Sequence, residues 1–253
     1  MPDFIFNVGA AGVEYPPAGR YYVVVDSGKD PFTGRSLAGP YVLHSWINDV
    51  TPPNVQALTQ RLSAGHPTIV ARITDAKSGV DPLSLLLLAN NNKLQIGATS
   101  FDPRTGIAVF PYPREDPPIQ PGSGFFQIVA SDFQEAKNIT DTGENPMPNT
   151  RFAGLRAKVV HGPATSWISP SKGTCLVGRT ILQVAATSTA QVSSVGLFDG
   201  KREIARLRKN VAGIYTYTWR TTGRRKGAHV LTAIASDTSG READASQPVR
   251  ICR

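Results

Sequence analysis

Two stretches with the same spacing decide the fold of this chain: Gly122-Ser-Gly-Phe-Phe-Gln-Ile-Val-Ala-Ser-Asp132 and Gly227-Ala-His-Val-Leu-Thr-Ala-Ile-Ala-Ser-Asp237. Side chains two positions apart on a β-strand point to the same side of a sheet, and apolar residues recur in both stretches at this period. The positions predicted to face a core are Phe126, Ile128, Ala130, Leu231, Ala233 and Ala235. Each stretch closes a longer pattern, residues 65–132 and 178–237, so we predict two tandem modules and not one catalytic body.

The composition favours a folded all-β protein. The 253 residues are 40% hydrophobic and 18% charged, enough for two domains of about 100 residues each. The 20 prolines and 23 glycines are spread without a period, which suits short strands joined by turns. No segment approaches the roughly 18 consecutive apolar residues that span a membrane. The first residues lack the basic and apolar parts of a signal peptide, so an export signal is expected upstream.

Proline-rich segments divide the chain into three parts. Residues 1–48 contain two strand-like runs, 20–25 and 41–47, which we interpret as the last hairpin of a truncated β-sandwich or jelly roll. The boundary at 48–53 contains Pro52 and Pro53, which stiffen a connection. Residues 138–174 are turn-rich and form the second boundary. We predict one sandwich at 49–158 and a second at 159–253.

Turn signals and an aromatic strand support this division. Asp102-Pro-Arg-Thr-Gly106 predicts a turn, and Phe198-Asp-Gly-Lys201 predicts a hairpin, because Asp-Gly suits a type I′ turn. Tyr215, Tyr217 and Trp219 alternate with two threonines. Such a face either belongs to the core or is an open ligand platform, and we favour the core.

Charge is unevenly distributed along the chain. Residues 1–150 carry 10 Lys/Arg and 14 Asp/Glu, net −4, whereas residues 151–253 carry 17 and 5, net +12. One interpretation of the excess of basic residues is a solvated face that keeps the module soluble. The other interpretation is a surface patch that binds a polyanion. Its members would be Lys201, Arg202, Arg206, Arg208, Lys209, Arg220, Arg224, Arg225 and Lys226.

The two cysteines lie at the two ends of the second repeat. Cys175 and Cys252 can meet if the first and last strands of the sandwich are neighbours. A bridge closing that loop stabilises the fold by roughly 4 kcal/mol in the chain-entropy model. A pair placed in this way indicates an oxidising compartment, and without nearby histidines it does not make a zinc site.

Two resemblances follow from these residues. The second repeat, from Val195-Gly-Leu-Phe-Asp-Gly-Lys201 to Gly227–Gly240, resembles the bacterial immunoglobulin-like modules appended to secreted enzymes and surface proteins. The first half, with Tyr21-Tyr-Val-Val-Val-Asp26, Ser45-Trp-Ile-Asn-Asp-Val-Thr-Pro-Pro53 and Asp75-Ala-Lys-Ser-Gly-Val-Asp81, is similar to C-terminal regions of subtilisin-like serine proteases. The second resemblance implies a catalytic domain outside this chain.

The sequence offers little catalytic chemistry of its own. A subtilisin-like triad needs a large α/β body, and the surroundings of its serine are missing. The four histidines, His44, His66, His161 and His229, read as ordinary strand or turn residues. We therefore predict no enzymatic activity within the chain, no catalytic residue and no bound organic cofactor.

Calcium is the metal to consider. Asp49, Asp75, Asp81 and Asp132 recur at turn and linker positions, and calcium takes six to eight oxygen ligands. The alternative is that these aspartates cap turns by accepting hydrogen bonds from their own backbone. Nucleic acid is disfavoured as a partner, because the basic residues lack a recognition helix and interleaved exposed aromatics.

These observations predict two tandem immunoglobulin-like β-sandwiches preceded by a β-hairpin. They favour a non-catalytic accessory region that spaces or anchors the upstream catalytic domain of a secreted protein, a subtilisin-like protease in the first place. The rival is a stand-alone cell-surface adhesion or carbohydrate-binding module. An anionic cell-wall polymer or polysaccharide is the expected partner of the basic patch, and the location is secreted, extracellular or cell-surface.

Overall fold

The computed structural model describes residues 17–26, 28–41, 43–47, 49–89, 93–136 and 149–252. The chain divides into two compact units, Met1–Ile47 and Asn48–Arg253. Among the residues described, no helix has the length and apolar character needed to cross a membrane.

The first unit lacks the predicted hairpin. Neither the run 20–25 nor the described part of 41–47 forms a strand, and the backbone pairing described in this unit is a single bridge between Lys29 and Ser36. Tyr22 and Val24 are 83% and 87% exposed. Two strands with no third strand or core beside them gain too little buried apolar surface to be stable, which accounts for the difference. The assignment of this unit to the end of a longer β domain stays a prediction.

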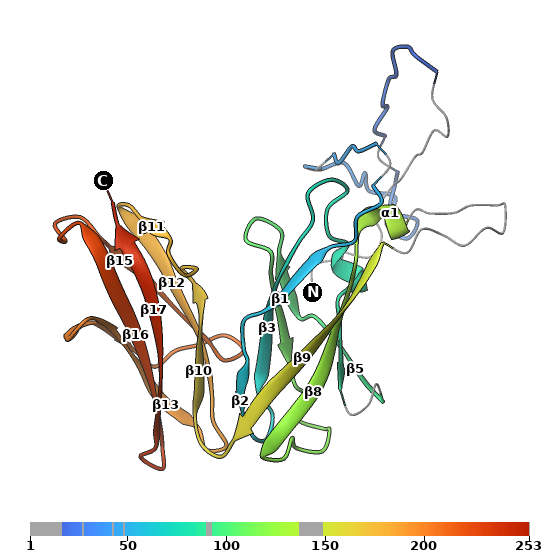
Figure 1. Ribbon diagram of the computed structural model, residues 1–253. Coiled ribbons are helices and arrows are strands. Elements are labelled where there is room, and N and C mark those ends of the chain that lie inside the picture. The colour runs from blue at the N-terminus through green and yellow to red at the C-terminus, as the bar shows by residue number, and fades with distance from the viewer. Residues whose placement is uncertain are drawn as a thin grey trace. The chain divides into compact units, whose positions relative to one another are not determined.

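The first sandwich consists of two mostly antiparallel sheets packed around one core (Figure 1). One sheet has the order β1 (Asn54–Ala57), β3 (Thr68–Thr74), β7 (Ile107–Pro111), β6 (Ser100–Asp102). The other has the order β2 (Arg61–Ser63), β9 (Thr150–Val160), β8 (Gly122–Ser131), β4 (Leu86–Ala89), β5 (Leu94–Gly97). A 3-10 turn, η1 (Pro82–Ser84), precedes β4, and a short helix, α1 (Phe133–Ala136), follows β8.

The second sandwich follows the same order with one strand fewer. Its sheets are β10 (Ala164–Ser169), β12 (Arg179–Thr187), β15 (Ile214–Arg220), and β11 (Cys175–Leu176), β17 (Glu242–Ile251), β16 (Gly227–Asp237), β13 (Val192–Asp199), β14 (Arg202–Leu207). In both sandwiches the short second strand pairs in parallel with the last strand, as β2 does with β9 and β11 with β17. The all-β, immunoglobulin-like prediction is confirmed.

The two similar stretches, 122–132 and 227–237, have the same structure. They form β8 and β16, and their first residues, Gly122 and Gly227, have φ of 133° and 122°. All six residues predicted to face a core are at most 3% exposed. The prediction of inward-facing positions is confirmed. Side chains alternate between the two faces of any single strand, so the sequence of one strand is enough to identify its apolar face.

The sandwiches are joined by a buried apolar contact, and the prediction that the second boundary, 138–174, is turn-rich is wrong for much of its described part. Strands β9 and β10 occupy most of the described part of this segment, residues 149–174, and residues 161–163 connect them. The apolar contact lies between the outer faces of β3 and β7 and the sheet of β10 and β12. Its buried members are Val70, Ile107, Val109, Ile168 and Ala185. This core of its own, beside the two sandwich cores, makes residues 49–252 a single packed unit.

Strand β3 is apolar on both faces because both of its faces are buried. Ile69, Ala71 and Ile73 point into the first core, while Val70 points into the contact with the second sandwich. A strand covered on both sides carries apolar residues on both sides, so its outer face cannot be identified from alternation alone.

Candidate functional sites

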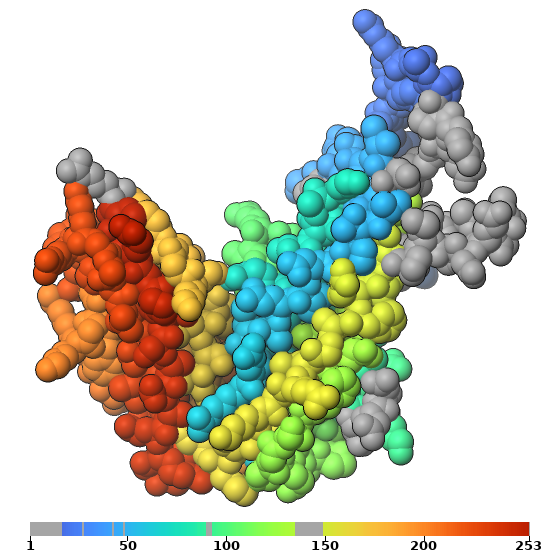
Figure 2. Space-filling view, viewed as in Figure 1, coloured from blue at the N-terminus to red at the C-terminus, as the bar shows by residue number. Residues whose placement is uncertain are grey.

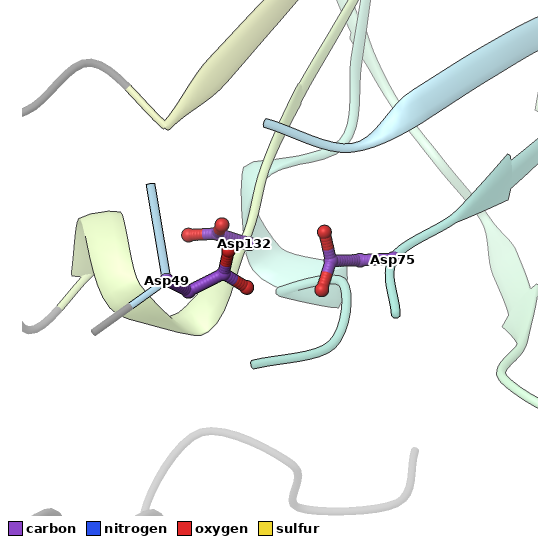
Figure 3. Close-up of side chains that lie close together, drawn as sticks. All are labelled: Asp49, Asp75 and Asp132. Carbon is purple, nitrogen blue, oxygen red and sulfur yellow. The ribbon is translucent and has the colours of Figure 1, made fainter. Parts of the chain in front are cut away.

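Three of the four predicted calcium candidates come together at one end of the first sandwich. Asp75 follows the end of β3, Asp132 follows the end of β8, and Asp49 lies just before β1. One carboxylate oxygen from each lies within 4.8 Å of the other two, and Figure 3 shows the three groups converging. Asp49 and Asp132 are 1% and 0% exposed, whereas Asp75 is half-buried. We call these three residues the acidic cluster.

Backbone and side-chain donors orient the acidic cluster. The Asp49 carboxylate accepts hydrogen bonds from Thr51 N at 3.1 Å and from both N and Oγ of Ser78 at 2.9 Å. Desolvation of Asp49 raises the pKa of its carboxyl, but the hydrogen bonds from Ser78 and Thr51 outweigh this effect and the net pKa is lowered. Asp49 is therefore held as a buried anion. Asp75 Oδ1 accepts from Lys77 N at 3.0 Å and Gly79 N at 2.9 Å.

Asn149 joins two members of the cluster. Its Nδ2 donates to the backbone carbonyl of Asp49 at 2.6 Å and to Asp132 Oδ2 at 2.9 Å. Asn149 is 1% exposed. Sequence reasoning missed Asn149 and Ser78, because both reach Asp49 only through tertiary packing, even though Ser78 lies in the stretch Asp75–Asp81.

Asp81 is not a member of the cluster. It caps η1, where its carboxylate accepts a hydrogen bond from Leu83 N at 2.9 Å. For Asp81 the structure supports the turn-capping alternative.

In the second sandwich the residue that matches Asp132 is Asp237, and its carboxylate has different partners. Asp237 Oδ1 accepts from Ser239 and from Arg241 N, its Oδ2 accepts from Ser188 Oγ at 2.8 Å, and Arg241 Nε lies 3.4 Å from it. The hydrogen bond from Ser239, with those from Ser188 and Arg241, holds the pKa of Asp237 far below its usual range. A guanidinium thus lies beside this buried carboxylate, and the matching Asp132 has Asp49 and Asp75 near it.

Electrostatics define what the acidic cluster can do. Two unit charges 4.8 Å apart repel by about 3 kcal/mol at an effective dielectric constant of about 20. Three such carboxylates favour a hard divalent cation, since its ligands are oxygens and its charge offsets the repulsion. The cluster supplies three carboxylates and so covers part of a calcium coordination sphere.

The predicted polyanion patch lies along the open edge of the second sandwich. Strands β14 and β15 are edge strands of the two sheets, and two open depressions of about 280 and 430 Å³ lie along them. Five predicted members line these depressions: Arg206, Arg208, Lys209, Arg220 and Arg224. The other four, Lys201, Arg202, Arg225 and Lys226, do not line them. We call the lining cations the basic edge.

One cation of the basic edge is already neutralised. Arg206 donates from Nε and Nη2 to the carboxylate of Glu203, the latter at 3.0 Å. Arg224 lies over the ring of Trp219, with its guanidinium carbon 5.8 Å from the ring centroid.

The aromatic face of β15 is mainly core. Tyr215 and Trp219 are 1% and 2% exposed and belong to the second core, and Tyr217 packs against it half-buried. The prediction of a core role is confirmed. Because this face is buried, it does not offer the planar aromatic row that a carbohydrate-binding module would expose.

The predicted disulfide is present. Cys175 and Cys252 are bonded, with their Cα atoms 5.7 Å apart, because β11 and β17 are parallel neighbours. No free cysteine is described.

Both ring nitrogens of His229 have hydrogen-bond partners. Its Nδ1 lies 2.8 Å from Asp199 Oδ1 and its Nε2 lies 2.7 Å from the carbonyl oxygen of Arg225. Desolvation lowers the pKa of His229, but the carboxylate and the carbonyl acceptor together raise it above 6.5. Both nitrogens are engaged, which suits a structural imidazolium and not a free general base.

Comparison with known proteins identifies one module. Residues 163–233 match the family of bacterial Ig domains, from the turn before β10 into β16. No curated protein matches the chain.

Several solved structures are similar. The fibronectin(III)-like modules of Clostridium thermocellum CbhA are 25% identical over 35% of this chain and 94% of that chain, with a TM-score of 0.30. Dimeric latent PorU from Porphyromonas gingivalis is 12% identical over 80% of this chain and 20% of its own, with a TM-score of 0.44. Bacteroides ovatus SGBP-B, solved with a mixed-linkage heptasaccharide, is 12% identical over 81% of this chain and 46% of its own, with a TM-score of 0.32. The chain thus spans less than half the length of the last two.

Proposed function

We propose that this chain is the accessory region of a larger secreted bacterial protein, in which it spaces and orients a catalytic domain. A subtilisin-like serine protease is the proposed parent, from the resemblance of the first half of the sequence. Support for a non-catalytic module comes from the match of residues 163–233 to bacterial Ig domains. The Cys175–Cys252 disulfide supports an extracellular location, because such bonds persist in oxidising compartments.

The observation that carries this proposal is the apolar contact between the sandwiches. Val70 and Ile168 are 0% and 1% exposed within it. Arg72 reaches across the same contact, where Nη1 donates to Ser171 Oγ at 2.7 Å and Nη2 to the carbonyl of Ile168 at 3.3 Å. Bending the two sandwiches apart would expose apolar surface and unpair these donors. A spacer needs this resistance to bending.

The spacer role is tested by distance measurement between spin labels, one in each sandwich of the full chain. We expect a narrow distance distribution for the wild type and a broader one for Ile168→Ser. Ile181→Ser is the matched control, since Ile181 is 55% exposed on the neighbouring strand β12. A broad distribution in the wild type would contradict the proposal.

The parent is tested in the source genome and in the assembled protein. We expect the reading frame to continue upstream into an export signal and a protease domain. Removing residues 48–253 from that protein should leave turnover of a small soluble peptide unchanged and lower turnover of a surface-bound protein substrate. An equal loss on both substrates would mean that the region acts on the catalytic domain itself.

The basic edge supports a second candidate function, adhesion to an anionic cell-wall polymer or polysaccharide. Arg208, Lys209 and Arg220 have no carboxylate partner among the described salt bridges. Adsorption of the full chain to anionic polymer should fall steeply with salt, because long-range attraction is screened. Arg208→Gln with Lys209→Gln should weaken adsorption, while Arg250→Gln should not. Salt-insensitive adsorption would contradict an electrostatic role for this edge.

We also propose that the acidic cluster binds calcium. With Asp49 and Asp132 buried, a cation there would tie the start of the second unit to the ends of β3 and β8. Calorimetry at millimolar calcium should detect binding to the wild type and at least roughly tenfold weaker binding to Asp75→Asn. Asp81→Asn is the control and should bind as the wild type does.

The calcium-free protein supplies a second readout of opposite sign. Asp75→Asn removes one of three like charges, so it should raise the melting temperature without calcium and abolish the rise that calcium causes in the wild type. Absence of binding to the wild type at millimolar calcium would remove the site.

A further inference from the structure

The outer face of the five-stranded sheet in the first sandwich carries two exposed aromatic rings. On β8, Phe126 and Ile128 point into the core, so Phe125 points outward. On β9, Leu155 and Ala157 point inward, so Phe152 points outward. Phe125 is 54% and Phe152 is 61% exposed. Figure 2 shows β9 in yellow and β8 in green side by side at the front of the view.

The strand register extends this apolar surface across the sheet. Phe152 on β9 is opposite Val129 on β8, and Val129 is opposite Leu86 on β4. The ring of Phe125 lies across Gly154: a Cβ added to Gly154 would lie 3.2 Å from Cε2 of Phe125. The glycine therefore lets this ring lie close to the backbone of β9 and lean towards Phe152.

Cations border the apolar surface on one side only. Arg156 is opposite Phe125, and Lys158, two positions further along β9, pairs with Arg61 on β2. All three are exposed. The outward positions of β2, β9, β8, β4 and β5 include no aspartate or glutamate. Along β9 the outward order is thus Phe152, Gly154 under the Phe125 ring, Arg156 and Lys158, at intervals of roughly 7 Å.

We propose that this face binds a linear anionic polysaccharide lying along β8 and β9. The C–H face of a sugar ring stacks on an exposed aromatic ring, and a guanidinium pairs with a carboxylate through two parallel hydrogen bonds. The face supplies both kinds of contact in one line, and its three unopposed cations complement negative charge in the ligand. An extended ligand can follow the outward side chains of β8 and β9, since these two strands pair with each other from Gly122 and Val159 to Ser131 and Thr150.

This site is separate from the basic edge, which lies on the second sandwich, and it does not depend on the accessory role. The two surfaces also differ in the expected salt response. Stacking on Phe125 and Phe152 is not screened by salt, so binding here should weaken with salt but persist at 0.5 M NaCl, about the point where simple ion pairing is lost.

The test is binding of the full chain to polygalacturonate, with fully methyl-esterified polygalacturonate as the uncharged match and dextran sulfate to distinguish carboxylate from sulfate. Phe152→Ala and Arg156→Gln should each weaken binding to polygalacturonate by roughly 3- to 10-fold. Val211→Ala and Arg250→Gln are matched controls, since Val211 is 81% exposed and Arg250 is exposed on β17, away from this face and from the basic edge. Unchanged thermal midpoints would show that the variants fold, as expected for exposed positions.

Three outcomes would overturn the proposal. One is no binding to any acidic polymer. Another is binding that Arg208→Gln weakens and Phe152→Ala does not, because the ligand would then lie on the basic edge. The third is equal or stronger binding to phosphatidylserine vesicles with the same dependence on Phe152, which would assign the face to a membrane surface. Stronger binding to dextran sulfate than to polygalacturonate would keep the site and identify its ligand as a sulfated polymer.

Discussion

Thr68 Oγ1 donates a 2.7 Å hydrogen bond to the carbonyl of Ala212, a residue 144 positions away in the other sandwich. Ala212 has a positive φ of 50°, which a residue with a Cβ rarely adopts. The next residue, Gly213, approaches Thr68 so closely that a Cβ there would lie 3.1 Å from its Oγ1. Ser63 Oγ adds a 2.8 Å bond to Thr187 Oγ1 across the same boundary. These two hydrogen bonds add to the apolar contact, and together they hold one sandwich against the other.

Truncation within this contact should be costly. Ile168→Ala should lower the free energy of unfolding by about 2–4 kcal/mol, because it removes buried methyl groups and leaves a cavity. Ile181→Ala, at an exposed position on β12, should change it by less than about 0.5 kcal/mol. Urea denaturation followed by fluorescence measures both. Equal effects would mean that the contact contributes nothing to stability.

Loss of the disulfide should destabilise the second sandwich. Cys175 and Cys252 are 77 residues apart, so Cys175→Ser should lower the free energy of unfolding by about 4 kcal/mol in the chain-entropy model. A reducing agent should destabilise the wild type and leave the variant unchanged. Differential scanning calorimetry with and without reductant tests this, and a wild type insensitive to full reduction would contradict it.

The pH dependence of stability should carry a contribution from His229. Its pKa is raised in the folded state, so the protonated ring stabilises the fold fully below about pH 6.5, its usual pKa, and this stabilisation is lost as the pH rises through the higher folded value. The difference in unfolding free energy between the wild type and His229→Gln should shrink over that rise. NMR titration of the ring measures the pKa directly, and a value at or below 6.5 would refute the expectation.

Gly106 should not tolerate a side chain. Its φ is 70°, and a Cβ there would lie 2.5 Å from the carbonyl oxygen of Ile73. Gly106→Ala should therefore lower the free energy of unfolding by about 2–3 kcal/mol, from strain and from displacement of β3. Gly97→Ala, with open space around it, should change it little. Chemical denaturation of the two variants compares them, and similar losses would show that the close approach is relieved in solution.

For the candidate sites, the sequence identified some residues, and tertiary packing decided which of them come together. Asp49, Asp75 and Asp132 could be named from their turn positions, but so could Asp81, which caps η1 instead. Only packing distinguishes them, since it brings the ends of β3 and β8 to one point. Phe125 and Phe152 show the same division: alternation with Phe126 places Phe125 outward, but only the pairing of β8 with β9 brings Phe152 onto the same surface.

By itself the sequence determined what depends on short periods. Alternation predicted the inward faces of β8 and β16, and the stretches Asp102–Gly106 and Phe198–Lys201 predicted turns. The places of Cys175 and Cys252 at the repeat ends predicted their bond. The tertiary structure decided which elements find a partner. It left the apolar run at 20–25 outside any sheet, buried β3 on both faces, and gathered residues 83 positions apart into the acidic cluster. The reason is physical: side-chain alternation follows from the geometry of one strand, whereas burial and charge balance depend on what packs against it.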